Sequence, residues 1–84
     1  MTRLVYFAWV RERIGTDEEE LDIPHDVTDV AGLLAFLQTR GENYASALVE
    51  PDVIRVALDR FHADHDAPIA GAREIALFPP MTGG

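Results

Sequence analysis

Apolar side chains follow one another without a breaker at the start of the chain. Both alternating sets in residues 2–10 are apolar: Leu4, Tyr6, Ala8 and Val10 in one, Val5, Phe7 and Trp9 in the other. This pattern predicts a first strand that is either central in a sheet or has one face on the core and one on a partner. A turn is predicted at residues 14–17. The acidic residues 18–23 predict a weaker edge strand, so residues 2–23 read as an antiparallel hairpin.

Helical spacing replaces this alternation in the middle of the chain. Val30, Leu33, Leu34 and Leu37 recur at intervals of three and four residues, with Phe36 beside them. Thr28 or Asp29 supplies an N-terminal cap, and Gly41 after Arg40 supplies a stop signal. The pattern predicts a helix over about residues 29–40. A shorter helical turn is expected around residues 44–49, ended by Pro51.

The second half of the chain returns to strand patterns. Residues 53–58 predict a third strand, Asp59-Arg60 a turn, residues 61–63 a short fourth strand and residues 73–78 the last strand. One main helix between these strands predicts an α+β domain, with the helix on one face of a mixed sheet of four to five strands. Ubiquitin-like β-grasp folds have this order, with the first and last strands side by side at the centre. Residues 1–84 are therefore expected to form one domain.

The final residues predict an extended arm, over residues 79–84. Pro79 and Pro80 lack the N–H that a sheet requires and favour an extended backbone. Met81 and Thr82 then lead to Gly83 and Gly84, where the absence of side chains lets a backbone enter a narrow space. The arm is suited to carrying a terminal carboxylate into a pocket of another protein. The alternative is an ordinary frayed tail.

Charge and composition narrow the classes of partner. The 7 basic residues, all arginine, face 15 acidic ones, for a net charge of −8. This charge argues against nucleic acid as a partner and favours a protein with a basic docking face, although acidity also serves solubility alone. The sequence has no cysteine, no apolar run that would span a bilayer and no signal-peptide pattern. We expect a cytoplasmic location and no membrane partner.

Two motifs resemble a known family. Residues 7–12, Phe-Ala-Trp-Val-Arg-Glu with Gly15 after them, resemble the "FA-x-x-RE-x-x-G" opening of the small subunit of molybdopterin synthase. Residues 74–84 are similar to that family's closing "E-V-A-x-F-P-P-x-x-G-G". The sequence departs from the family at Asp59, where members often have Asn, and at Ala72-Arg73-Glu74, where Gly-Asp-Glu is usual.

The resemblance implies a sulfur carrier without catalytic side chains of its own. An ATP-dependent, ubiquitin-activating-like adenylyltransferase would activate the Gly84 carboxylate, and a sulfur donor system would convert it to a thiocarboxylate. The tail of Pro79, Pro80, Met81, Thr82 and Gly83 would enter the large subunit of the synthase. There the sulfur would pass to cyclic pyranopterin monophosphate to build the molybdopterin dithiolene. The family works as a heterotetramer, and no bound cofactor is expected, since ATP is used by the activating enzyme.

Four side chains are candidates for binding that partner: Phe7, Trp9, His62 and Phe78. Phe7 and Phe78 are assigned to an interface rather than to the core, because Tyr6, Ala8 and Leu77 are available to face inward. For Trp9, core and interface are equally supported. His62-x-x-His65 with Asp64 and Asp66 resembles a metal cluster, but a polar loop is preferred, and no metal site is predicted.

Other functions stay open on the same residues. A ubiquitin-like protein modifier, joined through Gly84 to lysines of its targets, would also need this fold and Gly-Gly. So would a sulfur carrier of the thiamine or tRNA thiolation type. A plain interaction module is the third class, and intact function without Gly83 and Gly84 would indicate it.

Overall fold

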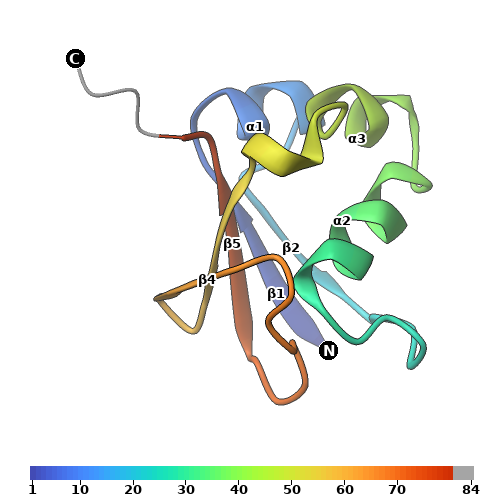
Figure 1. Cartoon of the computed structure of the whole chain (residues 1–84). Coiled ribbons are helices and arrows are strands. Elements are labelled where there is room, and N and C mark those ends of the chain that lie inside the picture. Colours follow the sequence, from blue (N-terminus) through green and yellow to red (C-terminus); the bar gives the residue numbers. More distant parts are fainter. Residues whose placement is uncertain (81–84) are drawn as a thin grey trace.

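A five-stranded mixed sheet forms the centre of the domain. The computed structural model describes residues 1–80. Its strands are β1 (Thr2–Tyr6), β2 (Glu18–Leu21), β3 (Arg55–Leu58), β4 (Phe61–Ala63) and β5 (Glu74–Phe78), in the spatial order β2-β1-β5-β3-β4. The β1–β5 pair is parallel and the other pairs are antiparallel. The predicted central pairing of the first and last strands, and the acidic edge strand, are confirmed (Figure 1).

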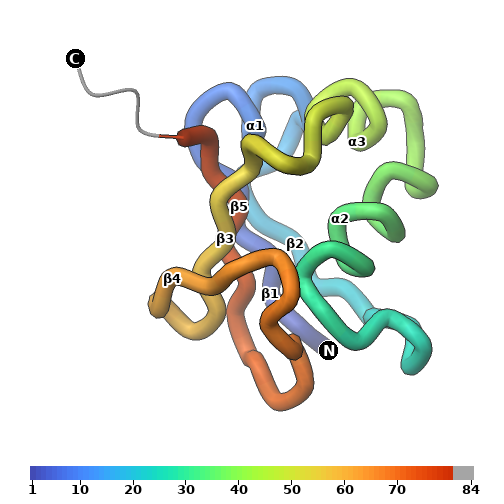
Figure 2. The backbone as a smooth tube through the Cα atoms, in the orientation of Figure 1, coloured from blue at the N-terminus to red at the C-terminus, as the bar shows by residue number. Residues whose placement is uncertain are grey.

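Helices cover one face of this sheet (Figure 2). They are α1 (Ala8–Ile14), α2 (Val30–Gln38) and α3 (Glu42–Ala47), followed by the 3₁₀ turn η1 (Pro51–Val53). The main helix α2 buries its apolar stripe against side chains of the sheet, and the fully buried members of this core include Val30, Leu33, Leu34, Leu37, Leu4, Tyr6, Ile75 and Leu77. The α+β prediction is confirmed, with a fuller helical layer than the single main helix expected.

The first strand is shorter than predicted. It ends at Tyr6, and residues 8–14 form helix α1. Val10 and Ile14, one helical turn apart, bury their side chains in the core. Seven residues are too few to reveal this spacing within an unbroken apolar run, so the alternation imitated a longer strand. Strands β1 and β2 are antiparallel as predicted, but a helix joins them in place of a hairpin turn.

Backbone geometry makes the change from strand to helix. Phe7 stays extended, with φ −125° and ψ 155°, and its N–H still donates to the Leu77 carbonyl at 3.1 Å. Ala8 then takes a positive φ of 52°, and its side chain is exposed, so the prediction that Ala8 faces inward is wrong. At the other end of α1, Gly15 caps the helix with φ 97°, a left-handed conformation that glycine adopts without a Cβ clash.

Of the two predicted caps of the main helix, Thr28 and Asp29, the structure shows Asp29. The Asp29 carboxylate accepts a hydrogen bond from the Gly32 N–H at 2.7 Å. The helix ends at Gln38, so Gly41 is not its stop signal; Gly41 instead precedes α3 as the N-cap. Pro51 likewise begins the 3₁₀ turn η1 rather than only ending a helix.

Asp59 and Arg60 form the predicted turn after β3. Both have positive φ values, 49° and 74°, as the tight turns of β-hairpins require. The predicted third strand was too long, because Val53 belongs to η1 and β3 begins at Arg55. No helix within residues 1–80 has the length and apolar character needed to cross a bilayer. The predicted tail residues Met81, Thr82, Gly83 and Gly84 lie outside the described residues.

Candidate docking face

The face of the sheet opposite the helices carries a run of apolar side chains. Because side chains alternate along a strand, the buried Leu4, Tyr6, Ile75 and Leu77 assign their neighbours to the other face. Val5, Ala76 and Ala57 lie in register across β1, β5 and β3. Together with Phe7 and Phe78 they form what we call the open-face patch: Val5, Phe7, Ala57, Ala76 and Phe78. Ala76 is 9% exposed and the other four members are half-buried or exposed, and none of the five belongs to the core cluster of residues 1–80.

Phe7 and Phe78 sit at the same end of the patch. Tyr6 is in register with Leu77, and Phe7 continues that pairing through its N–H, so Phe7 and Phe78 are the next residues of neighbouring parallel strands. Phe7 is 47% exposed and Phe78 is half-buried. Neither belongs to the buried core cluster. Their predicted place outside the core is confirmed, whereas contact with a partner stays a prediction.

Trp9 lies in the first turn of α1 rather than on a strand. It is half-buried and packs against the core cluster, and the Arg13 guanidinium carbon is 4.6 Å from the centre of the indole ring. Of the two alternatives for Trp9, core and interface, the structure shows partial packing against the core. A contact of its exposed part with a partner remains a prediction.

The arm begins at this end of the sheet. Pro79 and Pro80 directly follow Phe78, and both are half-buried and outside any strand. Figure 1 shows the described chain leaving the sheet at the end near α1, away from the N-terminus. A protein that covered Phe7 and Phe78 would thus meet residues 79 and 80 at the border of the same surface.

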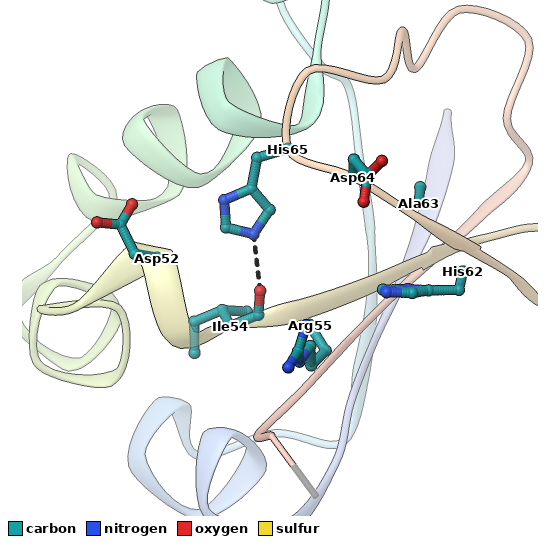
Figure 3. A pocket seen from close by; sticks show the side chains of 7 residues that line it. All are labelled: Asp52, Ile54, Arg55, His62, Ala63, Asp64 and His65. Carbon is teal, nitrogen blue, oxygen red and sulfur yellow. Dashed lines mark hydrogen bonds between the residues drawn. The ribbon is translucent and has the colours of Figure 1, made fainter.

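His62 borders the open-face patch from the edge strand. It is exposed on β4 in register with Ala57, and the two residues therefore share a face. With Arg55 and His65 it lines a shallow hollow of about 180 Å³, whose other lining residues are Asp52, Ile54, Ala63 and Asp64 (Figure 3). A His65 ring nitrogen, Nε2, lies 2.8 Å from the Ile54 carbonyl oxygen.

The polar residues around this hollow are not arranged as a metal site. In the described range 1–80, no three side chains of His, Cys, Asp or Glu are placed to hold a metal ion together. His65 instead ties its loop to the start of β3, and its backbone carbonyl accepts a hydrogen bond from Ala31 at 2.8 Å. The loop thus packs against the N-terminus of α2.

A second polar cluster holds the opposite edge of the sheet to the helices. The Tyr6 and Tyr44 hydroxyls both donate to Oε2 of Glu19, each at 2.7 Å, and Arg40 donates to Oε1 at 3.0 Å. Burial alone would raise the pKa of Glu19, but the hydrogen bonds from Tyr44, Tyr6 and Arg40 outweigh it and lower that pKa. Burial, and then the bond to Glu19, raises the pKa of Tyr6 and of Tyr44. Tyr6, Tyr44, Arg40 and Glu19 therefore have a structural role, since they bond to one another.

Sequence reasoning missed two features of these surfaces. It treated Arg55 as an ordinary strand residue, although its register opposite Phe78 places it beside the open-face patch. It also read Glu19 as one of several solvated edge charges. The alternation along residues 53–58 could have identified Arg55, but the cluster around Glu19 joins residues up to 38 positions apart and has no local signal.

Comparisons with known proteins agree with this architecture. A model described as the ThiS family matches residues 4–84. The molybdopterin synthase sulfur carrier subunit of Escherichia coli is 33% identical over 84 residues, covering all of both chains, and that of Haemophilus influenzae is 32% identical over the same span. Among solved structures, SAMP1 of Haloferax volcanii, a small archaeal modifier protein, has a TM-score of 0.71 and 25% identity over 99% of this chain and 98% of its own.

Proposed function

Since the chain belongs to the ThiS family, we propose that it is the sulfur-carrying small subunit of a molybdopterin synthase, acting in molybdenum cofactor biosynthesis. Sulfur carrier subunits of this synthase match the whole chain at 32–33% identity. The cytoplasm is the proposed site of action.

One structural observation carries the proposal. The central strand β5 is anchored through the fully buried Ile75 and Leu77, and it runs directly through Phe78 of the open-face patch into Pro79 and Pro80. A partner that covers the patch therefore meets Pro79 and Pro80 at a defined position. A sulfur carrier of this kind needs no pocket or catalytic side chain of its own, because the partner supplies both.

The proposed chemistry takes place at the Gly84 carboxylate. A carboxylate is a poor electrophile, so an adenylyltransferase of the ubiquitin-activating kind joins it to AMP from ATP and releases pyrophosphate. Sulfide, HS⁻, from a donor system then attacks the acyl carbon, displaces AMP and leaves a thiocarboxylate, C(O)S⁻. In the large subunit this sulfur passes to cyclic pyranopterin monophosphate, and water returns an oxygen to Gly84. Two such cycles supply the two sulfurs of the dithiolene.

Glycine at positions 83 and 84 is explained by this route. A Cβ at either position would widen a chain that must enter the active sites of both the activating enzyme and the large subunit. In the sequence, Gly83 and Gly84 follow shortly after Pro79 and Pro80, which directly follow β5 and favour an extended backbone.

Intact mass spectrometry tests the proposal. The chain is incubated with its adenylyltransferase, ATP and a sulfur source, and the expected product has one oxygen replaced by one sulfur at Gly84. Purified large subunit and cyclic pyranopterin monophosphate then yield molybdopterin. Gly84→Ala serves as the matched variant, with an unchanged fold and strongly reduced sulfur transfer. Unmodified mass together with full synthase activity would contradict the proposal.

A protein modifier is the second candidate, favoured by the likeness to SAMP1 over nearly the whole of both chains. In the same incubation it would form conjugates through Gly84 to lysines of other proteins. The sequence itself contains no lysine, so chains of such conjugates could not grow through lysines of these 84 residues. Conjugates without any thiocarboxylate would favour this alternative.

A further inference from the structure

Two polar side chains beside the open-face patch, Arg55 and His62, point to a specific feature of the partner. Arg55 is in register with Phe78 across the β3–β5 pair, and His62 is in register with Ala57 across the β3–β4 pair. Arg55 and Ala57 are two residues apart on β3, so all four side chains belong to the open face. Two hydrogen-bond donors, Arg55 and His62, thus lie beside Phe78 and Ala57 of the patch.

Arg55 keeps its charge available for a partner. Within residues 1–80, Arg3, Arg40 and Arg60 each have a carboxylate within 4.0 Å, and Arg13 lies over Trp9. Arg55, like the exposed Arg11 and Arg73, has no ion pair there, and its register opposite Phe78 places it beside the open-face patch. This holds although Asp52 and Asp64 line the same hollow. In the view of Figure 3, those two aspartates lie above strand β3 with His65, whereas Arg55 lies below it.

Docking on the patch would change the surroundings of this guanidinium. A protein that covers Phe78 and Ala57 excludes water from their neighbours, and a cation that loses water without a partner is strongly unfavourable. A carboxylate on the docking protein removes this cost, because the planar guanidinium matches it with two parallel hydrogen bonds. His62, which is in register with Ala57 and lines the same hollow as Arg55, offers a further donor on this face.

We propose that Arg55 recognises a carboxylate of the protein that covers the open face, with His62 beside it in the same contact. The inference rests on the proposed function, which makes that protein the large subunit of molybdopterin synthase. The inference assigns to the large subunit an acidic side chain opposite Arg55. The rest of the docking surface of the large subunit is expected to be basic, because this chain has a net charge of −8. One acidic contact in a basic surface would fix the orientation of docking.

Charge reversal at two arginines tests the inference. Arg55→Glu is compared with Arg73→Glu, which makes the same charge change on an exposed residue just before β5, at the end of the sheet opposite Phe78. Dissociation constants for the full chain and the large subunit are measured by calorimetry, and circular dichroism verifies that each variant is folded. Arg55→Glu is expected to weaken binding by at least about 30-fold, whereas Arg73→Glu changes it by less than about threefold.

Two further measurements make the result specific. Arg55→Gln keeps most of the side chain's length without charge and should weaken binding by about tenfold or more. Reversal of acidic residues on the large subunit, one at a time, should identify one variant that restores binding of Arg55→Glu. Equal effects of Arg55→Glu and Arg73→Glu, or tighter binding of Arg55→Glu, would overturn the inference and leave the proposed function standing. Failure of the unaltered chain to bind the large subunit would overturn both.

Discussion

The Tyr6 hydroxyl donates a hydrogen bond of 2.7 Å to the Glu19 carboxylate and so ties the central strand β1 to the edge strand β2 through their side chains. Tyr6 is 1% exposed, whereas Glu19 is only partly buried. Tyr44 of α3 donates to the same oxygen, so the contact also fastens the helical layer to the edge of the sheet. A carboxylate that looks like a solvated edge charge is thus a structural acceptor.

Replacement of Glu19 should reduce both stability and its dependence on pH. Glu19→Gln removes charged acceptors from three donors and is expected to cost about 1–3 kcal/mol of unfolding free energy at neutral pH. Since folding lowers the pKa of Glu19 from its ordinary 4.5, its contribution is present above that value and is lost as the pH falls through the lower pKa of the folded state. Urea unfolding at neutral pH and near pH 3 measures both effects.

The control for this experiment is Glu20→Gln, an exposed neighbour on the same strand that forms none of these hydrogen bonds. It should change the unfolding free energy by less than about 0.5 kcal/mol. An acid-induced loss of stability equal in Glu19→Gln and in the unaltered chain would contradict the assigned role of Glu19.

Asp59 should tolerate Asn but not Ala. Its Oδ1 accepts hydrogen bonds from the backbone N–H groups of Arg73 and Glu74, both at 3.0 Å, which fastens the β3–β4 turn to the start of β5. Asp59→Asn keeps an acceptor oxygen and a side chain suited to a positive φ, so a change below about 0.5 kcal/mol is expected. Asp59→Ala loses both bonds and should cost about 2 kcal/mol in thermal or urea unfolding. Equal stability of the two variants would refute this account.

Ala8 and Ala35 should respond to glycine in opposite directions. Ala8 has a positive φ of 52°, a conformation that costs an L-residue about 1–2 kcal/mol and costs glycine almost nothing. Ala8→Gly is therefore expected to be neutral or to stabilise the protein by up to about 1 kcal/mol. Ala35, exposed within α2, is the matched control, and Ala35→Gly should destabilise by about 0.5–1 kcal/mol. Destabilisation of similar size at both positions would argue against strain at Ala8.

Phe7 should matter for docking more than the better exposed Phe61. Phe7 belongs to the open-face patch, whereas Phe61, 78% exposed, is in register with the core-packed Leu58 and so lies on the other face. Phe7→Asp is expected to weaken binding of the large subunit by at least about tenfold, since it replaces an apolar contact by a charge. Phe61→Asp should leave the dissociation constant within about threefold. Weaker binding by Phe61→Asp than by Phe7→Asp would move the docking surface to the helix side of β4.

Local patterns predicted most elements of the fold. The alternating apolar residues located β5 and the start of β1, and the spacing of Val30, Leu33 and Leu37 located α2, with its cap narrowed to Thr28 or Asp29. The element order predicted the central pairing of β1 with β5. The strands and α2 depend on residues within one or two turns of each other, or on a side-chain period that a sequence displays directly, whereas the β1–β5 pairing was expected from the likeness of the element order to β-grasp folds.

Patterns failed where a short element follows another of similar composition. Helix α1 has seven residues within an apolar run that also fits a strand, and only contacts such as the Asn43 side chain with the Ile14 carbonyl, 2.6 Å apart, distinguish the two. The same holds for Val53, which the apolar run assigned to a strand and the structure assigns to η1. Packing of distant segments decides such cases, because local propensities differ by less than the packing energy.

The sequence by itself determined the acidic character of the domain, the α+β class and a family resemblance that the match to the ThiS family bears out. It determined these because charge, periodicity and motifs are properties of neighbouring residues. Only the tertiary structure decided that Phe7 and Phe78 lie on neighbouring strands at one end of the sheet, that Arg55 borders them without an ion pair in residues 1–80, and that Glu19 holds the opposite edge. Each of these depends on strand register, which brings together residues far apart in the chain.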